Sequence, residues 1–441
     1  MTQTTTTAPQ LDLSDLTLPV GSTQSVRRVL QAWLAKLLHD FSTIPLATLS
    51  LANRPLVTRT VQALARGDRK RALQLLRLPT ISTPIQCALK QLRPGGDGPA
   101  LNRWLRESCA LIWLELAAQG AIVGQVVVPA DGRLPTLLSP TLNLRVAPQP
   151  QTEQWLFEAG RLGVRTAASL HWLDLTVLGR EDDVIQLPGT TTDRPYHAIV
   201  PGVWLAAADN NPLADYEAHP DKSGNAISLG ERPASEWVAA LQQSFALLDE
   251  HLPLLGEEVR WILRLVVPVG WHGEKHLSAS YQEAVGVIYM TLHPQPMTMV
   301  EALIHEYQHN KINAVFSLDP LLHNAWSPLY ASPVRPDPRP LHGVVLAVHA
   351  FQAVADLYGA MVAAGHAWAT QQGWNDRYKK IIELDHQGAL TVLEHAQPTA
   401  VGRNYLGEMR RLDAKLQAIR HERWPDRPET SGNLDELAGH D

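Results

Sequence analysis

Apolar residues recur every three or four positions through the first quarter of the chain, and this spacing predicts helices with one apolar face. Residues 1–22 lack that spacing and are rich in threonine, so we expect a flexible N-terminus there. We therefore predict a helical region over residues 23–120. Its clearest helical segments are residues 26–41, 46–65, 70–78 and 100–118.

Beyond residue 120 the helical spacing is replaced by short runs of β-branched and aromatic residues, separated by Pro and Gly. We predict a β-rich region over residues 121–230, on which an edge strand could pair with an extended peptide. The strand candidates are residues 121–128, 169–178 and 197–206.

Helical spacing returns at residues 235–251 and again at residues 377–420. Between them, residues 261–267 and 284–292 have the composition of strands, and the second run leads directly into an apolar helical segment. We treat residues 231–425 as one region. The polar tail, residues 426–441, is expected to be loose.

Composition narrows the class of protein. Of the 441 residues, 45% are hydrophobic, which is ample for large cores, and the net charge of -6 gives no reason to expect nucleic acid. The two cysteines, Cys87 and Cys109, lie in apolar helical patterns and are expected to be buried thiols rather than a disulfide. We find no signal peptide and no window apolar enough to span a membrane. These features predict a cytoplasmic protein without a membrane partner.

The segment Glu301–Lys311 carries the chemistry, because His305, Glu306 and His309 form an H-E-x-x-H pattern. On a helix the two histidines lie one turn apart and can bind one metal ion, with Glu306 close enough to reach a metal-bound water. Thr298 and Glu301 have the spacing of a capping box that would start this helix. The alternative is a pair of core histidines that neighbouring backbone groups satisfy.

A strand followed by a metal-binding helix is typical of zincins. We therefore predict an α+β, predominantly helical fold with a zincin-like strand-helix core that carries the metal site, and the region 231–425 becomes the metal-binding catalytic region. The helical N-terminal half and the β-rich middle complete this fold class.

The usual third ligand of zinc peptidases is missing. Ile312 and Val315 stand where the compact peptidase motif has Gly and His, and no Glu occurs between Glu306 and Glu383. Two imidazoles rarely hold a catalytic metal alone, so another ligand is expected downstream.

The apolar helical run over residues 341–358 supplies candidates, since His342, His349 and Asp356 are seven residues apart and share one face. We predict His349 as the third ligand, because an unpartnered imidazole would be costly to bury among apolar neighbours. The alternatives are His342, Asp356, His323 and Asp319.

Three segments, residues 305–313, 332–341 and 349–356, resemble the H-E-x-x-H peptide-modification proteins that are encoded beside genes for ribosomally synthesised and post-translationally modified peptides. The S-P-x-R-x-D-P-R-P-L segment at 332–341 is the most specific of the three. The resemblance implies a non-haem iron enzyme that uses Fe(II), 2-oxoglutarate and oxygen to hydroxylate a side-chain β-carbon of a precursor peptide.

Under that reading, His305, His309 and His349 would hold the iron. The far carboxylate of 2-oxoglutarate suits an arginine, and Arg339 or Arg335 lies in a proline-rich segment that joins the two ligand-bearing helices. Arg339 is preferred because it adjoins the second helix. The alternative is that the segment is a proline-stiffened connection on the surface, in which both arginines are solvated and have no role in the site.

Two other functions fit the same residues. A zinc metallopeptidase would use Glu306 as the general base, whereas in an oxygenase Glu306 would support the ligands or position the peptide. A metal-stabilised peptide-binding partner of other maturation enzymes would have no chemistry of its own. Imidazole ligands suit zinc and iron alike.

Overall fold

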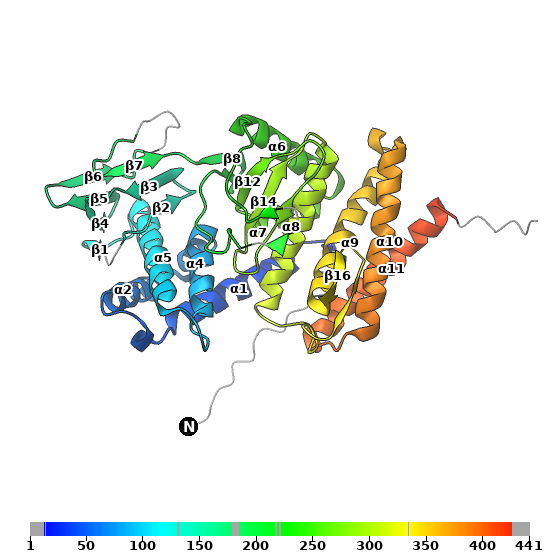
Figure 1. Ribbon diagram of the computed structural model, residues 1–441, viewed down its shortest axis with the longest axis horizontal. Coiled ribbons are helices and arrows are strands. Elements are labelled where there is room, and N and C mark those ends of the chain that lie inside the picture. The colour runs from blue at the N-terminus through cyan, green and yellow to red at the C-terminus, as the bar shows by residue number, and fades with distance from the viewer. Residues whose placement is uncertain are drawn as a thin grey trace, which may run out of the picture.

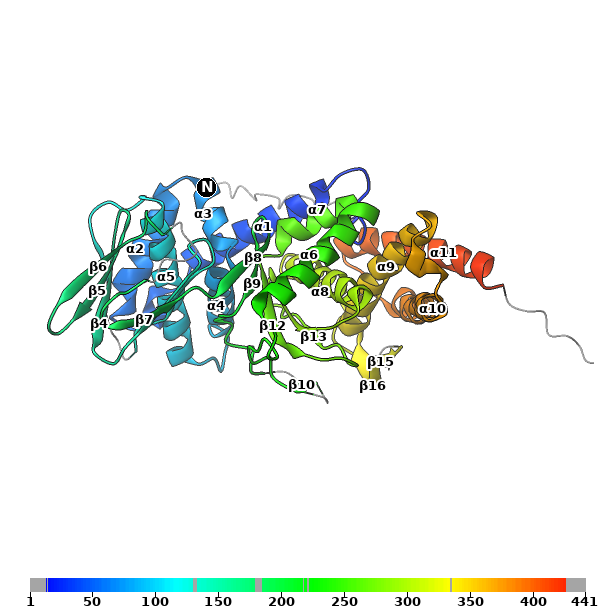
Figure 2. The same ribbon diagram turned by 90° about the horizontal axis from the view of Figure 1, so that it is seen from above.

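The computed structural model describes residues 13, 15–129, 133–178, 185–216, 218–219, 222–333 and 335–425. Helices α2–α5 and the first sheets lie at one end of the long axis, a sheet with helices α6–α8 lies in the middle, where α1 also runs, and α9–α11 form the other end (Figure 1). The same order along the axis is seen from above (Figure 2). Helices predominate over several separate sheets, which confirms the predicted α+β class.

Five helices and a short 3-10 turn form the N-terminal end. Helix α4 lies in the predicted helical region, but its bounds were not predicted, because β-branched residues and the internal Pro84 interrupt the apolar spacing. Pro79 in its first turn costs nothing, since the main-chain N–H that proline lacks would have no helical partner there. Cys87 and Cys109 are buried and unpaired, as predicted. The elements are α1 (Gln24–Ser42), η1 (Leu46–Thr48), α2 (Asn53–Arg66), α3 (Arg69–Leu76), α4 (Pro79–Lys90) and α5 (Gly98–Ala118).

Two antiparallel sheets and a small hairpin follow. The four-stranded sheet has the order β1-β4-β5-β6, the three-stranded sheet has the order β2-β3-β7, and β10 pairs with β11. The strands are β1 (Val126–Pro129), β2 (Leu137–Ser139), β3 (Leu144–Pro148), β4 (Thr152–Glu158), β5 (Arg161–Thr166), β6 (Leu170–Asp174), β7 (Thr190–Asp193), β10 (Ala218–His219) and β11 (Lys222–Ser223).

The central sheet has the order β13-β14-β12-β9-β8, and β12 runs parallel to both β14 and β9. Its strands are β8 (Tyr196–Val200), β9 (Val203–Ala206), β12 (Leu265–Trp271), β13 (Ser278–Ala279) and β14 (Val287–Leu292). The predicted boundary at residue 230 therefore passes through a hydrogen-bonded sheet. This is because β9, which pairs antiparallel with β8, has its parallel partner β12 about sixty residues further along the chain.

Six α-helices, one 3-10 turn and one hairpin make up the rest of the described chain. The predicted strand at 261–267 begins four residues later, because Trp261 and Ile262 end a helix. The single helical stretch expected over 377–420 is two helices, interrupted around Pro398. The elements are α6 (Ala234–His251), α7 (Pro253–Ile262), α8 (Pro296–Phe316), β15 (Leu329–Ser332), β16 (Arg335–Pro340), α9 (Leu341–Ala363), η2 (Ala367–Thr370), α10 (Gln372–His395) and α11 (Ala400–Arg423).

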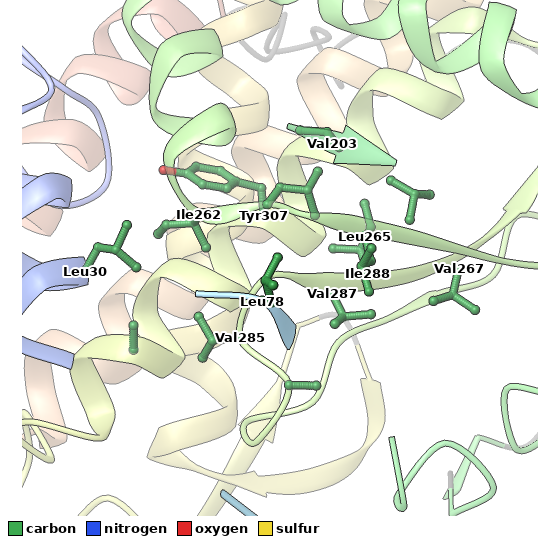
Figure 3. Close-up of a cluster of buried hydrophobic side chains, with 14 of the residues drawn as sticks. Leu30, Leu78, Val203, Ile262, Leu265, Val267, Val285, Val287, Ile288 and Tyr307 are labelled. Atoms are coloured by element: carbon green, nitrogen blue, oxygen red, sulfur yellow. The ribbon is translucent and has the colours of Figure 1, made fainter. Parts of the chain in front are cut away.

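The core that positions α8 is apolar. Strand β14 is buried at every position, and Tyr307 of α8 packs with Ile262 of α7 beside the strands (Figure 3). Val287 and Ile288 on β14 stand opposite Leu265 and Val266 on β12. A buried strand thus leads directly into helix α8, which carries the H-E-x-x-H pattern, as the sequence predicts.

Helix α9 corrects one expectation about membranes. Its 23 residues include a window of mean hydropathy 1.5, which is long and apolar enough to cross a bilayer, but 72% of that window is buried inside the protein. Core helices pass the same test. The described residues are therefore compatible with a soluble protein.

The start of the chain differs from the flexible lead-in predicted for residues 1–22. Leu13, Leu16 and Thr17 have 0–1% of their surface exposed. Leu13 and Leu16 belong to the main hydrophobic core. The free energy gained by burying their apolar surface outweighs the conformational entropy that a chain terminus loses on ordering. Residues 1–12 and the tail 426–441 lie outside the described residues.

Candidate metal centre

Helix α8 starts differently from the predicted capping box. Pro296 occupies the first turn and Gln295 is the N-cap residue without a side-chain cap, so Thr298 already lies inside the helix. Glu301 instead accepts hydrogen bonds from the Tyr358 hydroxyl and, at 2.7 Å, from the Arg377 guanidinium. The helix is fixed by its proline start and by these contacts to α9 and α10.

His305 and His309 form the pair that the motif predicts. Their Nε2 atoms are 2.9 Å apart, and the rings meet edge to face with centroids 4.4 Å apart. Two nitrogens that each bind one metal at ~2.1 Å would be ~3 Å apart at a right angle. The separation of the two nitrogens therefore suits two ligands of one ion.

Burial keeps both imidazoles in the form that binds metals. It lowers the pKa of His305, although the charges of Glu306 and Glu301 oppose that shift. It places the pKa of His309 well below the usual range, and a positive charge on His305 would lower it further. Neutral imidazoles at neutral pH are the state that metal binding requires.

Glu306 lies beside this pair with one oxygen free. Its carboxylate is 3% exposed, and Oε1 accepts a hydrogen bond of 2.7 Å from the Ser278 hydroxyl on the edge strand β13. Oε2 is buried without a hydrogen-bond partner among the described residues. Ligand atoms of His305, Glu306 and His309 lie within 4.8 Å of one another, so Glu306 belongs to the same candidate cluster as the two histidines.

Contacts between α8 and α9 show that the two helices are antiparallel. Glu301 near the start of α8 meets Tyr358 late in α9, the His305 and Phe351 rings are 5.2 Å apart, and Phe316 at the end of α8 lies 4.3 Å from His342 at the start of α9. This register places His349 opposite the turn that carries His309.

His349 has the environment expected of a ligand. It is fully buried, its Nδ1 lies 3.1 Å from the Thr17 hydroxyl, and its Nε2 has no hydrogen-bond partner among the described residues. Burial, with smaller effects from Lys311 and His309, holds its pKa well below the usual range. Among the described residues, however, the ligand atoms that lie within 4.8 Å of one another belong to His305, Glu306 and His309, and His349 is not part of this group.

The structure engages the other ligand candidates elsewhere. His342 stacks on Trp326 with centroids 4.3 Å apart and contacts Phe316, and burial lowers its pKa to about 4. Asp356 binds Lys415 of α11 at 2.5 Å. Neither side chain joins the histidine pair.

The two loop candidates support the fold after α8. Asp319 accepts hydrogen bonds of 2.7 Å from the Leu321 main chain and the Thr399 hydroxyl. The main chain of His323 donates to Gln397 at 2.8 Å. Both residues tie this loop to the start of α11.

The proline-rich segment forms a hairpin, in which Arg339 on β16 stands opposite Tyr330 on β15. The Arg339 guanidinium pairs with Asp337 at 2.9 Å, and its stem lies beside Gly343 in the first turn of α9. To bind a cosubstrate carboxylate, the Arg339 guanidinium would have to release Asp337. The side chain of Arg335 lies outside the described residues.

Sequence reasoning missed Thr17 and Ser278, which touch His349 and Glu306 respectively. No motif marks either one. The leucines at positions 11, 13, 16 and 18 were the available sign that the start of the chain packs into a core.

A comparison of the chain with protein-family models gave no match, and a search of curated proteins gave no significant match. The relation to the H-E-x-x-H peptide-modification proteins therefore stays a resemblance of the three motif segments.

Proposed function

We propose that this protein is an Fe(II)- and 2-oxoglutarate-dependent oxygenase that hydroxylates a side-chain β-carbon of a ribosomally made precursor peptide in the cytoplasm. The observation that supports it best is the set of three neutral imidazoles on two antiparallel helices: the half-buried His305 and His309 with Nε2 atoms 2.9 Å apart, and the fully buried His349 with its Nε2 unpartnered among the described residues. The motif resemblance adds the iron and the cosubstrate.

The residues fit such a centre chemically. Three imidazoles would hold Fe(II) on one side and leave positions for 2-oxoglutarate and oxygen. When bound, the iron and its cosubstrate supply a two-electron oxidation that converts a C–H bond to C–OH, while 2-oxoglutarate is converted to succinate and carbon dioxide. An uncharged ligand set favours a dianionic cosubstrate, because its charge balances that of the ion.

Arg339 is our candidate for the far carboxylate of 2-oxoglutarate. Its planar guanidinium already binds Asp337, and a cosubstrate carboxylate offers the same acceptor geometry with two oxygens. The buried, unpaired thiols Cys87 and Cys109 suit a reducing compartment.

Glu306 and β13 would position the peptide. Ser278 on this edge strand holds one Glu306 oxygen at 2.7 Å, so a peptide that paired with β13 would pass the second oxygen. In this role the Glu306 carboxylate accepts a hydrogen bond from the peptide.

A zinc metallopeptidase is the second candidate. The unpartnered Oε2 of Glu306 beside the histidine pair favours it, because a general base must face the metal-bound water. A metal-stabilised binding partner without catalysis is the third.

Anaerobic loading with Fe(II), followed by assay of succinate formed from 2-oxoglutarate and candidate precursor peptides, tests the proposal. We expect succinate and a peptide mass increase of one oxygen atom. His305→Ala/His309→Ala should abolish metal binding and turnover.

Glu306→Gln separates the two enzyme functions, since it should abolish hydrolysis and leave succinate release measurable. Arg339→Lys should raise the KM for 2-oxoglutarate at least tenfold, by loss of the two-pronged contact. Peptide cleavage with zinc and no succinate with iron would replace the proposal with the peptidase. Inertness with both metals would favour the binding partner.

A further inference from the structure

The start of the described chain forms an N-terminal strap, residues 13 and 15–18, that reaches the metal centre. Thr17 in this strap is fully buried, as is its neighbour Leu16, which has 1% of its surface exposed. Helices α8 and α11 contact Thr17. Its hydroxyl contacts His349, which is 332 positions away in the sequence. The hydroxyl beside His349 Nδ1 thus comes from the strap and not from α8 or α9.

The main chain of Thr17 is fixed by two helices. Its N–H donates to Glu408 of α11 at 2.9 Å, and its carbonyl oxygen accepts from Gln308 at 2.8 Å and from Lys311 at 3.1 Å, both on α8. Lys311 in turn pairs with Glu258 of α7 at 2.8 Å. These contacts leave the Thr17 side chain little freedom, so its direction is set by the fold.

The hydroxyl faces the ring of His349. A neutral imidazole has one N–H and one lone pair. When Nδ1 carries the hydrogen, it donates to Thr17 Oγ1 over 3.1 Å, and the lone pair is at Nε2. That Nε2 is buried without a partner in the described part of the chain, which is costly unless an ion binds there.

We infer that Thr17 is a positioning residue of the metal centre, whose hydroxyl accepts the hydrogen bond of the His349 Nδ1–H when Nε2 binds the ion, and so holds the ring in place. The inference rests on the proposed metal centre. Groups that orient a ligating histidine in this way commonly contribute 10–100-fold in metal affinity.

Metal affinity of the full chain tests this role without any turnover. The probe is Co(II), measured by competition with a chromophoric chelator and by its visible absorption. Thr17→Val keeps the side-chain shape and removes the hydroxyl, and we expect 10–100-fold weaker Co(II) binding with altered absorption bands. Thr17→Ser keeps the hydroxyl and should bind Co(II) within about threefold of wild type, as rescue by a conservative change.

Thr60→Val is the matched control. The Thr60 hydroxyl is also fully buried, but it bonds Leu56 and Trp113 in the N-terminal helices, so its loss should reduce stability and leave Co(II) affinity unchanged. Apo-protein unfolding midpoints of all three variants separate folding defects from metal effects.

The outcomes separate the inference from the function on which it depends. If wild type binds Co(II) and Thr17→Val binds it equally well, Thr17 has no positioning role although the metal centre stands. If Thr17→Val and Thr60→Val lose affinity alike, the effect is structural and the inference is wrong. Absence of Co(II) binding by wild type would instead overturn the metal centre itself.

Discussion

The buried ion pair between Lys311 and Glu258 provides a direct stability test. Lys311 Nζ lies 2.8 Å from Glu258 Oε2, and the side chains are 0% and 1% exposed. Coulomb's law gives this pair about 6 kcal/mol at an effective dielectric constant of 20, before the cost of removing both charges from water. Cutting one partner of such a pair typically costs 3–5 kcal/mol, because the other charge stays buried alone.

Glu258→Gln should therefore lower the free energy of unfolding by about 3–5 kcal/mol. The amide still accepts a hydrogen bond from Lys311 but cannot offset its charge. Urea unfolding of the apo protein, followed by tryptophan fluorescence, measures the change.

Two further variants show whether the charge or the packing matters. Glu258→Leu/Lys311→Met removes both charges and should recover most of the loss, since apolar pairs of similar volume often replace buried ion pairs without cost. Asp249→Asn breaks the more exposed pair with Arg260, at 2.6 Å, and should cost less than about 1 kcal/mol. A Glu258→Gln protein within 1 kcal/mol of wild type, or a double variant as unstable as the single one, would refute the reasoning.

Three other predictions concern groups outside the metal centre. Burial raises the pKa of Cys87 and of Cys109 to about 12, so a thiol reagent at pH 8 should label neither until the chain unfolds. Burial also raises the pKa of Glu107 to about 7 from the ordinary 4.5. The folded state therefore keeps the carboxyl proton to higher pH than the unfolded state, and the free energy of unfolding falls as the pH rises from about 4.5 to 7. Glu107→Gln should flatten that fall in urea titrations at several pH values. Gly402→Ala would place a Cβ 1.9 Å from a carbonyl oxygen and should cost at least about 2 kcal/mol in urea unfolding, whereas Gly407→Ala in open space on the same helix should gain up to about 1 kcal/mol; equal effects of the two changes would contradict this.

Local patterns predicted the elements that carry the histidines. The run of β-branched residues in β14 and the apolar spacing around His305 and His349 depend on neighbours within one or two turns, and these elements lie where the sequence indicated. The predicted Thr298 cap is wrong, because Pro296 starts the helix earlier and Glu301 accepts a hydrogen bond from Tyr358 on another helix, a contact that local spacing does not encode.

Long-range pairing defeated the sequence reasoning. Strand β9 pairs with β12, about sixty residues further along the chain. The sequence of neither strand indicates which strand it pairs with. Thr17 is an ordinary polar residue until α8 and α11 surround it, and Ser278 becomes part of the centre only because β13 lies over Glu306. Such residues are recognised by three-dimensional contacts, which spacing does not encode.

The N-terminal strap also sets the order in which the centre can form during synthesis. Thr17 is held by Glu408, which is 391 positions later in the chain. At 5–20 residues per second, a ribosome needs about 20–80 s to reach that residue. His305, His309 and His349 emerge before then, but the strap gains its α11 anchor only after residue 408 has been made. A nascent chain therefore carries its histidines through the ribosome exit without the complete support that the finished fold gives to His349.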